Sequence, residues 1–269
     1  MPADNPAQEL KDLLAVLLPP DKVYQPAVKK ELQIKILEAL DEGISHESFY
    51  LVFNLLTGEF DHVNGVEKWL GYSNREFTVN RYLNMIHPGQ AILHNMIARS
   101  MYTTLCKGTF KLQFSRQRYI SQIGLRHYNG EYIGFKKTTS IFQFDQHNRL
   151  LAQLNEFTKI DAYESEPLKP RITEIDGLQK DDFERMVFRA TLETFMEKKF
   201  FSETEFKVLK IYAEKETISS KQLAELLHVA IPTIDTFNKR ILAKARQTFT
   251  HSFDNARQVA LYLKKEKIV

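Results

Sequence analysis

The periodicity of apolar residues changes near residue 161 of this 269-residue chain, and the change restricts the folds that the sequence can adopt. Before that point short strand-like runs follow one another, whereas beyond about residue 178 only helical periodicity is present. The intervening Asp161-Ala-Tyr-Glu-Ser-Glu-Pro-Leu-Lys-Pro170 is rich in charge and proline, as linkers are. The sequence therefore predicts two domains of different class, joined near residues 161–178.

After two N-terminal helices, the first part of the chain is predicted to contain two strands, then helices, then three strands. Helical patterns cover about 5–18 and 27–41, a hairpin turns at Thr57-Gly58, helices pass through 66–70 and about 92–105, and strands follow at about 109–126, 131–144 and 150–160. Because the strands are consecutive within each group, we expect an antiparallel sheet with its helices collected on one face.

The helix expected at 27–41 has an apolar face. Val28, Leu32, Ile36 and Leu40 recur at helical spacing. This face must pack on something, either the core of the following domain or the same helix of a second copy.

Four short motifs occur in a fixed order between residues 45 and 160. They are Asn54-Leu-Leu-Thr-Gly58, Val66-Glu-Lys-Trp-Leu-Gly-Tyr72, Leu83-Asn-Met-Ile-His-Pro88 and Arg126-His-Tyr-Asn-Gly-Glu-Tyr132. Together they resemble the opening hairpin, the "LLGY" turn, the "IHP" turn and the "R-x-x-D-G-x-Y" hairpin of PAS domains. Gly89-Gln90 departs from the acidic residues usual after the "IHP" turn. The resemblance implies a sensory domain that responds to a ligand or a partner.

The last 69 residues show helix signals in close succession. Ser202 and Glu205 have the spacing of a capping box, a second helix begins at Ser219 or Ser220, and Pro232 stands in the first turn of a third helix. His228-Val-Ala230 forms the tight turn between the second and third helices. This order is that of a helix-turn-helix, whose last helix reads DNA.

Three segments of this region resemble LuxR-type helix-turn-helix domains. They are Phe201–Leu209, Ser220–Ala224 and Val229–Leu242, and Asn255–Leu263 is similar to the family's fourth helix. The resemblance implies that DNA is contacted by Ser220, Lys221, Thr233, Asp235, Thr236, Lys239, Arg240 and Lys244. Asp235 stands at the family's lysine position, so either the helix is displaced from phosphate or Asp235 accepts a hydrogen bond from a cytosine amino group.

Charge is distributed unevenly along the chain. Residues 201–269 carry 12 Lys and Arg against 8 Asp and Glu, whereas residues 1–200 have a net charge of −1. A basic segment of this kind favours a polyanionic partner, although a solvated helical surface has the same excess.

Other classes of protein fit the sequence poorly. The apolar run Leu13–Leu18 is too short to span a bilayer, so we expect a cytoplasmic protein with no membrane contact. The single cysteine, Cys106, excludes an internal disulfide and favours a buried apolar role over a redox thiol. No phosphate loop, nucleophile elbow or metal-ligand spacing is present, so we expect no enzyme and see no cofactor signature.

These observations predict an α+β protein, with an N-terminal PAS-like antiparallel sheet and helices followed by an all-α LuxR-type helix-turn-helix domain. The expected divisions are N-terminal helices (1–42), a sensory domain (43–160), a linker and connecting helix (161–200) and a DNA-binding domain (201–269). The interior of the sensory domain is either filled by side chains or holds a small ligand, and abundant Phe and Tyr with no evident anchoring charge favour a filled core.

The expected function is sequence-specific transcription regulation, with the signal passing through the helix at 181–198. Its partners would be double-stranded DNA, a second copy in a homodimer, and RNA polymerase. The alternative is a protein-interaction adaptor with a degenerate helix-turn-helix that does not bind DNA.

Overall fold

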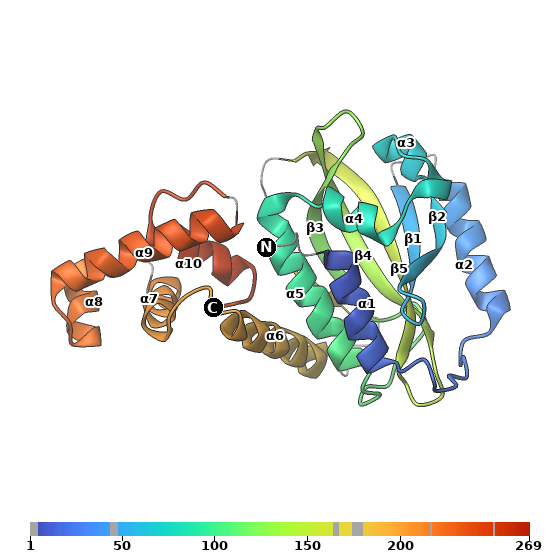
Figure 1. The fold of residues 1–269 in the computed structure, drawn as a ribbon, viewed down its shortest axis with the longest axis horizontal. Helices are drawn as coiled ribbons and strands as arrows, with labels where there is room; N and C mark the ends of the chain where they lie inside the picture. The colour runs from blue at the N-terminus through green and yellow to red at the C-terminus, as the bar shows by residue number, and fades with distance from the viewer. Residues whose placement is uncertain (1–4, 44–47, 164–166, 174–179, 216, 250) are drawn as a thin grey trace.

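The computed structural model describes residues 5–43, 48–163, 167–173, 180–215, 217–249 and 251–269. An N-terminal antiparallel sheet with helices is followed by an all-helical C-terminal region, which confirms the predicted α+β class. Figure 1 shows the C-terminal helices gathered at one end of the molecule and the sheet at the other, with α6 (Lys180–Glu197) near their junction. The expected domain boundaries remain a prediction.

The sheet has six strands in the order β2-β1-β5-β4-β3-β6. Their bounds are β1 Ser48–Asn54, β2 Glu59–Asn64, β3 Arg118–Arg126, β4 Tyr132–Phe144, β5 Leu150–Ala162 and β6 Arg171–Thr173. The hairpin of β1 and β2 turns at Gly58, whose φ of +66° is one that glycine adopts without strain.

Two features of the sheet differ from the prediction. The third strand begins at Arg118 instead of near residue 109, because the chain turns at Ser115, whose φ is +59°. A sixth strand, β6, was not expected in the proline-rich linker. It pairs with β3 because Ile172, opposite Tyr119, is buried there.

Helices cover both faces of the sheet, so the expectation that they collect on one face was wrong. α1 (Pro6–Leu17), α3 (Val66–Leu70), α4 (Val79–Met85) and α5 (Pro88–Leu105) lie over the inner face, and a 3-10 turn spans Asn74–Glu76. α2 (Lys30–Gly43) lies over the other face (Figure 1). The cause is alternation along β1, since Leu51 and Phe53 point inward while Tyr50 and Val52 meet α2.

The apolar side of α2 packs on its own domain. Ile36, Leu37 and Leu40 lie against Tyr50, Val52 and Phe142 of the sheet. Of the two occupants considered for this face, the protein's own core covers this part of it, whereas Leu32 remains exposed.

The C-terminal region contains α7 (Glu203–Glu214), α8 (Ser220–Leu227), α9 (Ile231–Phe249) and α10 (Ala256–Lys265). Both the Ser202–Glu205 capping box and a second box, Ser219 with Gln222, are present. His228 ends α8 in the left-handed conformation and turns the chain into α9. The predicted helix-turn-helix order is confirmed.

The two regions share one hydrophobic cluster. Phe195 of α6 lies against Phe206 of α7 and Phe249 of α9, and the cluster continues into α1 and α5. Leu168 of the linker donates its N–H to buried Glu266, 2.6 Å away, near the end of the chain. The C-terminal helices are therefore docked on the sensory region.

Candidate functional site

A cavity of about 430 Å³ lies between the inner face of the sheet and helices α1, α4, α5 and α6. This volume is within the range of about 300–1,000 Å³ typical of small-molecule sites. Its apolar wall includes Leu10, Leu13, Phe53, Phe60, Val79, Leu83 and Met96. The expectation of an interior filled by side chains was therefore wrong.

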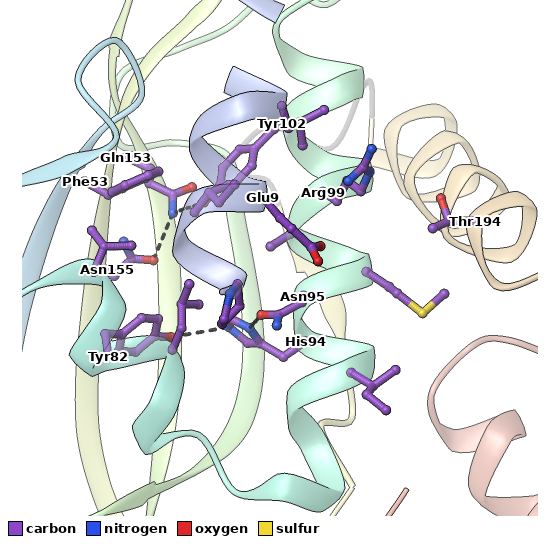
Figure 2. A pocket seen from close by; sticks show the side chains of 18 of the residues that line it. Glu9, Phe53, Tyr82, His94, Asn95, Arg99, Tyr102, Gln153, Asn155 and Thr194 are labelled. Atoms are coloured by element: carbon purple, nitrogen blue, oxygen red, sulfur yellow. Dashed lines mark hydrogen bonds between the residues drawn. The ribbon is translucent and has the colours of Figure 1, made fainter. Parts of the chain in front are cut away.

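Polar side chains line the sheet side of this cavity (Figure 2). Gln153 Nε2 donates to Tyr102 Oη at 2.9 Å and approaches Asn155 Oδ1 at 3.4 Å. Thr139 Oγ1, directly across the strand pair, donates to the same Asn155 oxygen at 2.8 Å. Short polar groups at these inward positions leave volume that larger apolar side chains would fill, which explains the hollow interior.

Lys137 of β4 is the charged group at this inner face. Its side chain is buried, and Nζ lies 3.3 Å from His94 Nε2 of α5. Nζ also lies 5.5 Å from the centre of the Tyr82 ring and 5.9 Å from that of Phe157, within the range of cation–π attraction. In the part of the chain that the structure describes, no carboxylate oxygen lies within 4.0 Å of Nζ.

The hydrogen bonds of His94 assign its tautomer. Nδ1 lies 3.3 Å from Asn95 Oδ1, which only accepts, so Nδ1 carries the hydrogen. Nε2 then accepts from Tyr82 Oη at 3.3 Å and from Lys137. Figure 2 shows the Tyr82 and His94 side chains meeting at the edge of the cavity.

Burial controls the charges at this site. It lowers the pKa of Lys137 to about 7, because the ammonium loses its hydration in an apolar setting. Burial and the nearby Lys137 charge lower the pKa of His94 to about 3. The imidazole is therefore neutral at physiological pH, and Lys137 changes its charge near neutrality.

Neither Lys137 nor His94 was predicted from the sequence to be a site residue. A signal was present, since Phe135, Lys137, Thr139 and Ile141 alternate along one strand and three of these four suit an inner face. A lysine in such a series points to a buried charge. The structure also shows Cys106 buried, as expected, and burial raises its thiol pKa to about 12.

The residues predicted to contact DNA lie on α8 and α9, and α8 with the start of α9 forms the end of the molecule away from the sheet (Figure 1). Exposed among them are Lys221, Asp235, Thr236, Lys239 and Arg240, while Ser220, Thr233 and Lys244 are partly buried. The Thr236 hydroxyl donates to the main-chain oxygen of Pro232, one turn earlier, at 3.0 Å. Their contact with DNA remains a prediction.

Lys244 has a structural role in this arrangement. Its ammonium forms a 2.6 Å ion pair with buried Glu205, the capping-box glutamate of α7. Burial raises the pKa of Glu205, but hydrogen bonds from Lys244 and Ser202 outweigh it and keep the pKa below its ordinary value. Lys244 thus joins α9 to α7, which the sequence did not indicate.

The fold and site define a class of protein: an α+β chain with a cavity in its sheet region and a helix-turn-helix at its C-terminal end. No protein-family model and no curated protein sequence matches the chain. No helix in the described ranges is long and apolar enough to cross a membrane. Those ranges also contain no group of three His, Cys, Asp or Glu side chains placed to hold a metal.

Distant similarity to solved structures is present over most of the chain. A phage VqmA–DPO complex is 12% identical, with a TM-score of 0.32, over 88% of this chain and 89% of that one. The Vibrio cholera VqmA–ligand–DNA complex is 13% identical, with a TM-score of 0.24, over 87% and 90%. SdiA in complex with octanoyl-rac-glycerol is 14% identical, with a TM-score of 0.26, over 99% and 97%. Likenesses of this size say nothing about what this chain binds.

Proposed function

We propose that this protein is a sequence-specific DNA-binding transcription regulator, in which a small molecule in the cavity controls the helix-turn-helix. The observation that carries the proposal is that residues of the sheet and of the α6–α7 connection line one cavity. Thr194 and Lys198, at the end of α6, and Phe200, just before α7, line the same cavity as the sheet residues. An occupant would therefore touch both the sensory sheet and the connection to α7.

The connection between cavity and DNA-binding helices is short and packed. Phe195 follows Thr194 of the cavity wall, Phe200 is part of that wall, and both rings lie against Phe249 at the end of α9. A ligand shifts an equilibrium between two arrangements only as far as it binds one better than the other. The two arrangements would be the C-terminal region docked on the sensory region and separated from it. If α6 moves between them, a ligand in contact with the end of α6 binds one arrangement better than the other.

The helix-turn-helix has the features that DNA binding needs at its exposed end. Lys221, Lys239 and Arg240 are solvent-exposed, and the cap of α8 at Ser219 orients main-chain N–H groups that can contact phosphate. Asp235, also exposed, is the feature that favours the alternative of an adaptor without DNA binding, because its carboxylate repels phosphate.

The test is selection of duplex DNA from a random pool by the full-length protein, followed by affinity measurement at several salt concentrations. We expect an enriched sequence, steep salt dependence and a loss of affinity of at least tenfold in the double variant Lys239→Ala/Arg240→Ala. Lys29→Ala/Lys30→Ala, which removes the same charge from exposed positions far from α9, should bind as the unchanged protein does. No enrichment and no binding at low salt would favour the adaptor.

A further inference from the structure

A buried lysine amine lines the cavity, and none of the described carboxylates pairs with it. Lys137 is 6% exposed and contacts a neutral imidazole and two aromatic rings, and no described carboxylate is within ion-pair distance. An isolated buried ammonium is costly in free energy, so buried charges in proteins are normally paired. The cavity wall thus presents a buried amine whose charged form a nearby anion would stabilise.

Among the described residues, the groups beside Lys137 do not supply the negative charge. His94 is neutral, and Tyr82 and Tyr102 keep their protons because burial raises the pKa of both phenols. Glu9 is the acidic residue among those lining the cavity, and it is exposed on α1, opposite the sheet. Arg99 and Lys198, at the α5 and α6 sides, add positive charge to the same cavity.

Resting on the proposed role of the cavity as a ligand site, we propose that its ligand is a small amphipathic molecule with a carboxylate that pairs with Lys137. The carboxylate would lie at the Lys137 end, beside the neutral His94. The apolar part of the ligand would lie against Leu13 of α1 and Phe53 of β1, on the apolar wall.

Electrostatics gives this pairing a measurable signature. An anion beside Lys137 restores the charged form of the amine, so ligand binding at pH 8 takes up a proton that the empty site lacks. His94 accepts from Lys137 and has its own pKa near 3, so it stays neutral and contributes no proton at this pH.

The experiment is isothermal titration of the full-length protein with two matched pairs of probes. The pairs are hexanoate with hexanamide and 3-phenylpropanoate with 3-phenylpropanamide, which differ in charge but hardly in shape. Titrations at pH 8 in buffers of different ionisation enthalpy give the number of protons taken up. We expect at least one acid to bind tenfold more tightly than its amide, with uptake of about one proton.

Variants at neighbouring positions separate the role of Lys137 from general effects. Lys137→Met should abolish both the preference for the acid and the proton uptake, and Lys137→Gln provides a second neutral side chain if the first fails to fold. Lys136→Met is the matched control, because Lys136 is exposed on the opposite face of β4. The control should keep both properties.

Besides a failure of every probe to bind, three results would overturn the inference. They are an acid that binds no better than its amide in either pair, binding without proton uptake, and a preference that persists without Lys137. If no probe binds, the carboxylate inference fails, whereas the proposed DNA binding is measured without any ligand and is judged separately.

Discussion

The hydroxyl of Tyr262 in α10 donates a hydrogen bond of 3.0 Å to the main-chain oxygen of Gly89 in the first turn of α5. Gly89 also lies against α9, since a Cβ at this position would be 2.8 Å from the main-chain oxygen of Phe249. Two C-terminal helices thus meet the sensory region at one glycine.

This contact predicts the effect of Gly89→Ala. Alanine suits a helix better than glycine, so α5 itself should not weaken, but its methyl group cannot fit beside a main-chain oxygen at this distance. We expect α9 and α5 to separate, seen as a larger radius of gyration by small-angle X-ray scattering. Tyr262→Phe, which only removes one hydrogen bond, should cost about 1 kcal/mol of stability without this expansion. An unchanged radius in Gly89→Ala would show that the docking tolerates a side chain there.

Lys137 predicts an unusual pH dependence of stability. Its pKa is about 7 when folded and about 10.4 in an unfolded chain, so between these values the unfolded state binds a proton that the folded state does not. The free energy of unfolding should therefore rise with pH, by about 2–3 kcal/mol between pH 7 and pH 9. Urea titrations should show this rise in the unchanged protein and in Lys136→Met, and its loss in Lys137→Met. A rise that survives in Lys137→Met would assign it to another group.

Asp235 is expected to weaken binding to non-specific duplex DNA, because its exposed carboxylate lies on the proposed recognition helix α9. In Asp235→Asn the repulsion disappears, and affinity at low salt should increase about threefold to tenfold. Fluorescence anisotropy with labelled duplex measures this. Asp21→Asn removes the same charge from an exposed position near the N-terminus and should have no effect. If Asp235 instead reads a cytosine, its substitution will weaken binding to the selected sequence.

Breaking α6 tests whether this helix transmits the signal. Met186→Pro removes a helical hydrogen bond in the interior of α6 and costs about 3 kcal/mol of helix stability, whereas Met186→Ala keeps the helix. We expect the DNA affinity of the proline variant to move severalfold towards that of the isolated 201–269 fragment. Equal affinities and an equal effector response in both variants would make α6 a passive spacer.

A homodimer is expected because helix-turn-helix readers of this class usually span two half-sites. The chain itself covers Ile36, Leu37 and Leu40 of α2, the helix whose apolar face the sequence offered to a second copy, so this prediction now depends mainly on the half-site argument. Light scattering at tens of micromolar decides it, and a monomer would contradict it.

Local chemistry was readable from the sequence. The Ser202–Glu205 capping box, the Thr57-Gly58 turn and the helix start beside Pro232 each depend on residues a few positions apart, and the structure contains all three. The division into a sheet region and a helical region follows from periodicity, because alternation and helical spacing bury different sets of side chains.

Contacts between residues distant in sequence were decided only by the tertiary structure. Lys244 pairs with Glu205 across 39 positions, β6 joins β3 from within the linker, and α2 takes the opposite face of the sheet from α1. The presence of the cavity was likewise decided only by the tertiary structure. Alternation places Lys137 on the inner face, but whether that interior is filled or hollow depends on how closely α1, α4, α5 and α6 approach the sheet. That approach is determined by the packing volumes of many side chains at once, which no local pattern in the sequence records.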